Sequence, residues 1–413
     1  MRLMIATENR FYEGPSGRIY SDTVCNYQFW RRYLQVFDEV VIFARVGKID
    51  KEPTKPAADG AGVSFYRLPM YVGPQQYLMR RKQIHEIAAR ATEHADAFIL
   101  RIPGRCGTLL WKELRKRSIP FGVEVVGHAG DSCKTSGANF FVKNMLRFVS
   151  PRQQRLECRQ AAAAAYVTER YLQKDFPPGG WSTYYSSIDL YEDAFITEAQ
   201  LREKLARLGE AIEGKRPFRL CHAGTMAAKY KGQDILIEAA GRCLREGLNL
   251  EVVLMGDGRF RPFYEQKAAA MGIAERVRFL GSVPPGQAVR DEYDRADMLV
   301  FPSLTEGLPR TIIEAMARGL PCAASNVGGI PELLAEEFLV KPGDADDLAR
   351  RIAFMLSRRE VLERAALQNL HKAREYRYDV LNERRISFYE QVRQASLTFN
   401  SRDKGKGRIY GNE

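Results

Sequence analysis

The chain has 413 residues, of which 45% are hydrophobic and 28% are charged, a composition that excludes a largely disordered protein and predicts two or three domains. No apolar run approaches the roughly 18 residues of a membrane span, and the N-terminus lacks the pattern of a cleavable signal, so we expect a cytoplasmic protein. Seven cysteines without a CxxC pair argue against both a disulfide framework and a zinc site.

The first half of the chain alternates short apolar segments with helix-like ones. Strands are predicted at 3–6, 40–44, 63–68, 97–102, 121–126 and 164–168, and helices at 75–94 and 108–117. Such alternation indicates βαβ units and a parallel sheet. We therefore predict a Rossmann-like domain over residues 1–188.

The second half repeats the pattern after a Pro/Gly-rich break at 175–181 and a charged helix at 198–213. Strands are predicted at 218–222, 250–255, 277–280, 298–301, 322–324 and 338–340, and helices at 233–245, 263–271, 286–295, 311–317 and 346–356. This predicts a second doubly wound sheet over 189–378. A last helix follows at 379–398, and we expect residues 399–413 to be disordered. Ligands bind beyond the carboxyl ends of such strands, so a cleft between the two sheets is the expected site.

The net charge of +12 is unevenly placed. Residues 1–190 carry 28 Lys and Arg against 18 Asp and Glu, and the remainder carries 35 against 33. Basic residues gather at 80–82, 112–117 and 143–155. This face suits anionic lipid headgroups, a phosphorylated acceptor or nucleic acid, and a plain solvated surface is the alternative. No nucleic-acid motif accompanies the charge, so we expect no nucleic-acid partner.

The most informative stretch is 301–334, where a buried strand is followed by the turn Glu306-Gly307-Leu308-Pro309 and a helix. Free backbone N–H groups at a helix start favour an anion, and a diphosphate fits. Glu306 in the loop and Glu314 one turn into the helix can both reach one bound molecule. One carboxylate could accept hydrogen bonds from a ribose and the other from sugar hydroxyls. The alternative is that both are solvated surface acids.

Three other loops follow strands of the second half. Lys231, just before a helix, could neutralise a phosphate, and Gly224 allows a tight turn after the preceding strand. Gly256 belongs to LMGDGRF, which lacks the third glycine of a dinucleotide fingerprint and disfavours an oxidoreductase. Val283, within GSVPPG, could offer backbone contacts to a base.

Two loops of the first half also follow strands. Gly17 lies in the flexible loop 13–18, which could line the site or simply connect two elements. His128 lies in a glycine-flanked loop, a placement that favours a site over a core histidine. The DxD string at Asp344 and Asp346 opens a helix, so we interpret it as a cap and expect no metal site.

Residues 217–357 resemble the C-terminal domain of family 4 retaining glycosyltransferases, which have the GT-B fold. The resemblance rests on Lys231-Gly232, MGDG, RFLGSV, the Glu306-x7-Glu314 spacing, GGIPEL and KPGDADDLA. It implies two Rossmann-like domains facing across a cleft, the first binding the acceptor and the second a nucleotide sugar. The last helix would cross back to the first domain.

The resemblance also implies roles for individual residues. Glu314 would hold the donor ribose, Glu306 the donor sugar near its reacting carbon, and Lys231 the leaving diphosphate. The backbone N–H groups of Gly307 and Leu308 would contact sugar or phosphate, and His128 resembles a first-domain histidine near the donor sugar.

Thr225 departs from the family pattern, since many members have an arginine directly after the glycine that corresponds to Gly224. That arginine usually forms a two-cation clamp with the lysine. Arg310 or Arg18 could substitute for it, or the grip on the phosphate could be weaker.

We thus expect a metal-independent, cofactor-free retaining glycosyltransferase that moves a hexose-type sugar from UDP or GDP to a hydroxyl of a saccharide or lipid-linked acceptor. Polysaccharide or cell-envelope biosynthesis would fit, with the basic first domain at the inner face of an anionic membrane. The alternatives are a nucleotide-sugar 2-epimerase of the same fold and a basic, non-enzymatic binding protein.

Overall fold

The computed structural model describes residues 1–407 except 22, 24 and 135–139, with side chains described outside 132–148 and 402–407. Part of the basic cluster at 143–155 therefore lies outside the described side chains. The chain forms two compact units. Unit 1 comprises Met1–Val167, Leu172–Tyr185 and the chain from Glu383 onward, and unit 2 comprises Thr168–Tyr171 and Ser186–Asn382.

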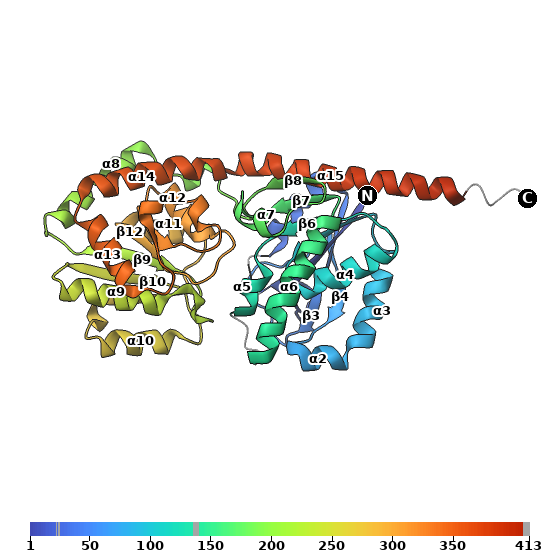
Figure 1. The fold of residues 1–413 in the computed structure, drawn as a ribbon, viewed down its shortest axis with the longest axis horizontal. Coiled ribbons are helices and arrows are strands. Elements are labelled where there is room, and N and C mark those ends of the chain that lie inside the picture. The colour runs from blue at the N-terminus through green and yellow to red at the C-terminus, as the bar shows by residue number, and fades with distance from the viewer. Residues whose placement is uncertain (22, 24, 135–139, 408–413) are drawn as a thin grey trace, which may run out of the picture. The chain divides into compact units, whose positions relative to one another are not determined.

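Unit 1 is built on one sheet whose strands run in the order β4-β3-β1-β5-β6-β7-β8 (Figure 1). Neighbours along this path pair in parallel. The bounds are β1 Arg2–Glu13, β3 Glu39–Lys48, β4 Val63–Pro69, β5 Ala97–Ile102, β6 Gly122–Val125, β7 Ala163–Tyr166 and β8 Trp181–Tyr184. The helices are α2 Gly73–Met79, α3 Arg81–Ala91, α4 Arg105–Lys116, α5 Ala129–Lys134, α6 Phe140–Gln160 and α7 Tyr171–Asp175.

Unit 1 departs from the sequence prediction in its first strand, in its first long helix and in its last strand, and α5, α6 and α7 were not predicted. The first strand does not end at residue 6 but runs to Glu13, because it turns back and pairs antiparallel with β2 (Ile19–Ser21). The single helix predicted at 75–94 is divided at Arg80, whose backbone leaves helical geometry with φ −105° and ψ 6°. Strand β8, which pairs with β7, was missed because it is short and directly follows a Pro/Gly-rich segment, which indicates a loop.

Unit 2 is a six-stranded parallel sheet in the order β11-β10-β9-β12-β13-β14. In chain order this is 3-2-1-4-5-6, the order of a dinucleotide-binding Rossmann fold. The bounds are β9 Phe218–Ala223, β10 Leu250–Met255, β11 Val277–Gly281, β12 Met298–Phe301, β13 Cys322–Ser325 and β14 Leu339–Val340. All six strands were predicted, because each is a short, mostly apolar run between turn residues.

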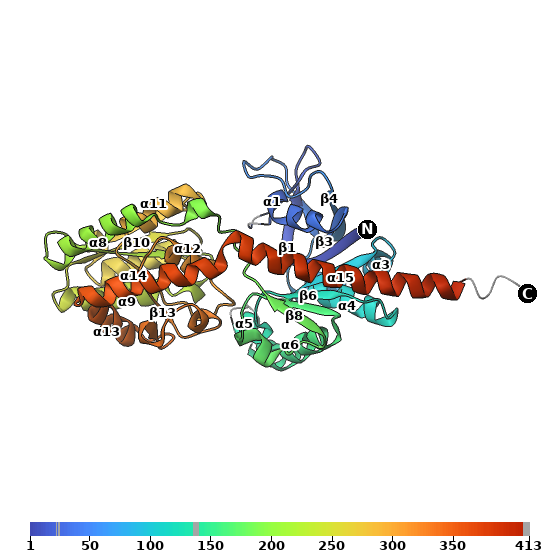
Figure 2. The same cartoon turned by 90° about the horizontal axis from the view of Figure 1, so that it is seen from above.

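Helices cover both faces of this sheet, as Figure 2 shows from above. They are α8 Glu198–Ile212, α9 Gln233–Arg245, α10 Arg261–Ala270, α11 Gln287–Arg295, α12 Arg310–Ala317, α13 Ala345–Leu356 and α14 Arg359–Ala373. The apolar stripes of α8, α9, α10, α13 and α14 pack with the strands in one continuous core. The sequence prediction missed α14 alone among them. Asp344 caps α13, since its Oδ1 accepts from the backbone N–H of Asp347 at 2.9 Å, which confirms the interpretation of the DxD string.

The last helix, α15 (Tyr378–Gly407), begins in unit 2 and continues in unit 1. There it packs on β6, because a Cβ on Gly122 would lie 2.4 Å from a methyl of Val392. The prediction of disorder from residue 399 was wrong as far as Gly407, and residues 408–413 lie outside the described part of the chain. None of the helices in the described ranges combines the length and apolarity that crossing a bilayer requires.

Candidate active site

The candidate site lies beyond the carboxyl ends of the neighbouring parallel strands β9 and β12 of unit 2. After β9 the chain continues to β10 on one side, and after β12 it continues to β13 on the other side, so the strand order reverses here. Ligands of open α/β sheets bind beyond the carboxyl ends of strands at such a switch point. The loops that follow the two strands touch here. The backbone N–H of Leu304 donates to the carbonyl of Tyr230 at 2.7 Å. Gly232 has φ +76°, and a Cβ there would lie 2.1 Å from the carbonyl oxygen of Pro302, so only glycine allows this approach.

Lys231 and Glu306 meet at this contact. Lys231 Nζ donates to Glu306 Oε1 at 2.6 Å, and Ser303 Oγ approaches the same oxygen at 2.7 Å. The side chains are only 16% and 10% exposed. The structure therefore brings together two of the predicted catalytic residues, and it adds Ser303, which the sequence prediction missed.

The loop after β9 is held in place by Gln233, the first residue of α9. Its buried amide donates to the carbonyls of Gly224 and Thr225 at 3.2 and 3.1 Å. Gly256, at φ +132°, lets the loop after β10 approach, since a Cβ there would lie 2.1 Å from the carbonyl oxygen of Gly224. Thr225 itself is exposed. Gln233 was also missed, although its place directly after Lys231-Gly232 was a usable signal.

Two helix N-termini open onto the same edge of the sheet. α9 begins at Gln233 and α12 begins at Arg310, and no side chain caps either of them. The first N–H groups of a helix lack intrahelical partners and favour negative charge. Together with Lys231 they form an environment suited to a diphosphate. Arg310 adds a cation in the first turn of α12.

His222, near the carboxyl end of β9, lies fully buried beneath these loops. Its Nδ1–H donates to the carbonyl of Val300 at 2.9 Å, and its Nε2 has no partner among the described residues. Burial is the main cause that lowers the pKa of His222 to about 4, and the charge of Lys231 lowers it further. The imidazole is therefore neutral at neutral pH. The sequence prediction missed this residue, because a histidine inside a strand indicates core.

Glu314 faces a pocket of about 170 Å³ beside the switch point. Burial raises the pKa of its carboxyl, and the charge of Arg310 partly offsets that effect. The pocket combines this carboxylate with mostly apolar walls, the usual composition of a ligand site. The lining residues are Ile188, Asp189, Leu190, Ala194, Pro285, Gly286, Val289, Arg290, Tyr293 and Glu314. Val283 is not among them, although its neighbours Pro285 and Gly286 are.

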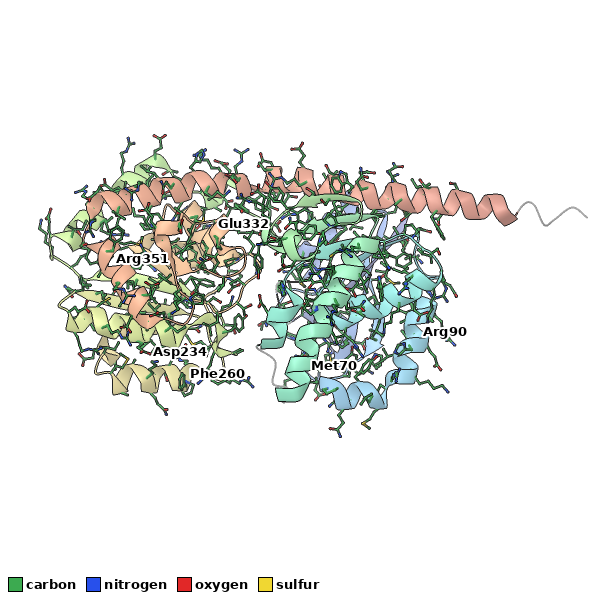
Figure 3. All side chains as sticks on the ribbon, in the orientation of Figure 1. Met70, Arg90, Asp234, Phe260, Glu332 and Arg351 are labelled. Atoms are coloured by element: carbon green, nitrogen blue, oxygen red, sulfur yellow. The ribbon has the colours of Figure 1, made fainter. Side chains whose placement is uncertain are left out.

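The Glu306-Gly307-Leu308 turn is held by the loop that follows β13. Gly329 N–H donates to the carbonyl of Gly307 at 2.7 Å, and Gly328, at φ +57°, lies against the carbonyl of Glu306. Further along, the carboxylate of Glu332 (labelled in Figure 3) accepts from the backbone N–H groups of residues 169–171. The turn is thus built from fixed neighbours and can present its own N–H groups.

The remaining predicted site residues belong to unit 1. His128 Nδ1 accepts from Gly130 N–H at 3.0 Å and its Nε2 lies 3.3 Å from Asp175 Oδ2, so both ring nitrogens are engaged. Gly17, at φ +80°, forms the tight turn between β1 and β2. Arg18 pairs with Asp59 at 3.2 Å.

No group of three or more His, Cys, Asp or Glu side chains suited to a metal ion occurs in the part of the chain that the structure describes. The Lys231–Glu306 pair, the Glu314 pocket and the starts of α9 and α12 all belong to unit 2, and they are the candidate site of this unit.

Residues 217–358 match the family model described as "Glycosyl transferases group 1". The chain is 28% identical to Protein CapJ of Staphylococcus aureus over 344 residues, 83% of this chain and 84% of that one. It is 31% identical to the alpha-D-kanosaminyltransferase of Streptomyces kanamyceticus over 299 residues, 70% and 74% of the two chains.

Among solved structures, Anabaena HepE in complex with UDP and glucose resembles this one with a TM-score of 0.64 and 15% identity, over 93% of this chain and 98% of that one. This likeness, with the two parallel-sheet units, shows that the fold is GT-B.

Proposed function

Because the chain belongs to the group 1 glycosyltransferases and is an enzyme of glycan biosynthesis, we propose that it is a family 4 retaining enzyme that uses a nucleoside-diphosphate sugar. The donor would be a UDP- or GDP-linked hexose. The acceptor would be a hydroxyl of a saccharide or of a lipid-linked saccharide. Polysaccharide or cell-envelope assembly at the inner face of a membrane is the setting that we propose.

The observation that carries this proposal is that Lys231 pairs with Glu306 in the same unit in which Glu314 lines a pocket. A nucleoside diphosphate joins a ribose, which a carboxylate binds through two hydroxyls, to a diphosphate, which a cation and helix N-termini bind. The structure offers these groups in one unit and at one edge of one sheet. The UDP and glucose named for Anabaena HepE support the same class of donor.

In the proposed reaction the acceptor oxygen forms a bond to the anomeric carbon while the bond from that carbon to the β-phosphate oxygen breaks. Front-face attack would retain the configuration, and the leaving phosphate would take the proton of the acceptor hydroxyl. Lys231 and the N-termini of α9 and α12 would stabilise the negative charge that develops on the diphosphate. Glu306 would orient both Lys231 and the sugar hydroxyls.

Thr225 leaves the loop after β9 without an arginine to pair with Lys231, and the other lysine of this loop, Lys229, lies over the ring of Phe263. We therefore propose that Arg310 is the second cation of the phosphate site. It starts α12 and lies close enough to Glu314 to act on the pKa of that carboxyl. Arg18 is less suited, because Asp59 already neutralises it. We propose His128 as a residue that contacts the donor sugar, and no divalent metal is required in this scheme.

A thermal-shift screen of UDP, GDP and their sugars tests the donor class. A ligand that binds the folded state alone at about 100 times its Kd stabilises that state by about 2.7 kcal/mol, which gives a clear rise in Tm. Stabilisation by one diphosphate that survives EDTA is expected. No stabilisation by any nucleoside diphosphate would contradict the proposal.

Two variants test the residues. Glu314→Ala and Lys231→Ala should each lose donor binding or turnover, while Glu360→Ala and Lys341→Ala, which remove exposed charges of the same unit, should keep both. Wild-type transfer by both site variants would refute the site. Product analysis completes the test, since conversion of a UDP-sugar without any acceptor would identify an epimerase instead.

A further inference from the structure

An exposed apolar and basic segment lies on unit 1, away from the residues considered so far. Val72, Leu78 and Met79 are 53%, 63% and 81% exposed, and Arg80, Arg81 and Lys82 follow directly. We call these six residues the α2 rim. No other stretch of eight residues contains three exposed large apolar side chains among the described side chains. Single exposed apolar residues are normal, but a cluster marks a surface that binds something.

The α2 rim is held rigidly from its inner side. Tyr77 of α2 is buried, packs its ring against Tyr71 with centroids 5.5 Å apart, and lies under the guanidinium of Arg105 at 4.3 Å. Its hydroxyl lies 3.2 Å from His85 Nε2 of α3. The packing of α2 therefore relies on Tyr77, and the next two residues, Leu78 and Met79, are left in solvent without a structural role. Figure 1 shows α2 along an outer edge of unit 1, and Figure 3 labels Met70, just before it, at the same edge.

Positive charge surrounds these apolar side chains. Residues 72–85 contain three basic residues and no acidic one, and the first acid of α3, the exposed Glu86, follows directly. Lys112 of α4, a helix that packs against α3, is also exposed. The acid nearest to this group in α4, Glu113, is buried and already paired with Lys116 and Arg117.

We propose that the α2 rim docks this protein onto an anionic phospholipid bilayer, with Leu78 and Met79 inserted among the acyl chains and Arg80, Arg81 and Lys82 on the phosphates. Apolar side chains flanked by a basic run are the pattern of an interfacial anchor that lies on a membrane without crossing it. If this surface bound a protein instead, we would expect polar residues of both charges around its apolar centre. The inference rests on the membrane setting of the proposed function and names the surface that would make the contact. It does not depend on the transfer reaction itself, because it concerns other residues and another ligand.

Vesicle flotation of the full chain tests this. The protein should partition onto phosphatidylcholine vesicles that contain roughly one-third phosphatidylglycerol, should ignore pure phosphatidylcholine, and should bind less as salt is raised from about 0.05 to about 0.5 M. Arg80→Gln/Arg81→Gln/Lys82→Gln should weaken partitioning about a hundredfold, since each basic residue contributes about fivefold. The matched control is Lys48→Gln/Lys51→Gln/Lys55→Gln, which removes the same charge from exposed positions of unit 1 and should change partitioning by about twofold at most.

The inserted side chains are tested separately. Leu78→Ser/Met79→Ser should weaken partitioning at least about tenfold, and Leu367→Ser, an exposed leucine of unit 2, should have no effect. Equal thermal unfolding midpoints establish that these surface variants are folded. The proposal would be overturned if the triple variant at 80–82 and the control triple variant at 48, 51 and 55 lost vesicle binding equally. Unchanged partitioning of Leu78→Ser/Met79→Ser would also overturn it. So would a wild-type dimer in analytical ultracentrifugation that Leu78→Ser/Met79→Ser converts to a monomer, because the α2 rim would then join two copies of the chain.

Discussion

Lys231 Nζ and Glu306 Oε1 are 2.6 Å apart, at the contact of two loops that are 75 residues apart in the sequence. The charge of Lys231 is thus satisfied before any ligand arrives. A diphosphate must share the ammonium with Glu306, and the carboxylate keeps Lys231 pointing at the site in the meantime. This pair links the stability of unit 2 to its chemistry.

The pair predicts opposite outcomes for stability and activity. Lys231→Met leaves a mostly buried carboxylate unpaired and should destabilise the protein by about 2–3 kcal/mol, and Glu306→Gln should cost less because Ser303 still bonds the amide. The double variant Lys231→Met/Glu306→Gln should recover most of that stability but no sugar transfer. Urea unfolding and donor turnover measure the two. Additive losses in the double variant would show that the pair is not coupled.

Glu314→Gln should make the ligand-free protein more stable and its nucleotide binding weaker. Burial raises the pKa of this carboxyl, so its ionised form is unfavourable in the folded state at neutral pH. The penalty is present above the folded pKa and disappears as pH falls below the unfolded value of about 4.3, so the advantage of Gln should shrink on acidification. The amide loses charge-assisted bonds to ribose hydroxyls worth about 1.5–3 kcal/mol in all. Thermal unfolding at two pH values, with and without UDP, measures both the stability and the nucleotide binding. A ligand-free variant that is less stable than the wild type would contradict the prediction.

His222 should make unit 2 sensitive to acid. Its pKa is lowered to about 4 in the folded protein from 6.5, so between these values the unfolded chain binds the proton and the folded chain does not. Stability therefore falls as pH drops through this window, by about 3 kcal/mol in total for a shift of this size. His222→Asn can still donate to the carbonyl of Val300 and should flatten this dependence. Chemical unfolding from pH 7 to pH 4 measures it, and parallel curves for variant and wild type would disprove the assignment.

Gln233→Leu should weaken nucleotide binding without touching the nucleotide. The variant keeps the volume and the helix but removes the donors that hold the carbonyls of Gly224 and Thr225. We expect a Kd for UDP about tenfold higher, from the loss of roughly one to two hydrogen bonds of loop positioning. Gln233→Glu, which presents an acceptor to the same carbonyls, should be worse. Calorimetric titration gives the Kd, and equal binding by Gln233→Leu would remove the positioning role.

Unit 2 was predictable from sequence because local signals agree with the tertiary structure there. Each of its strands is a mostly apolar run, and parallel strands that are covered on both faces have that pattern. The candidate site could be proposed because Lys231 lies just before α9, Glu306 follows β12 and Glu314 lies one turn into α12. Glycines 232 and 256 permit the close contacts that unite these loops.

Other features depend on contacts that no local pattern encodes. The continuation of the first strand to Glu13 depends on pairing with Ile19–Ser21, and the side chains of Gln233 and Ser303 acquire their roles only when separate loops meet. Helix α15 was cut short at residue 398 in the prediction because the charged and glycine-containing end of the chain has a composition typical of disorder.

The switch point also sets an order of events during synthesis and refolding. β12 pairs with β9, the first strand of unit 2, only after β10 and β11 have been made and the chain has returned to the other side of β9. Secondary structure in β9 and β10 can form from neighbouring segments, whereas the lysine and its acidic partner meet only when that long-range insertion is complete. A refolding chain should therefore regain its circular dichroism before it regains affinity for a fluorescent nucleotide, and a ribosome-bound chain that stops short of residue 301 should have none.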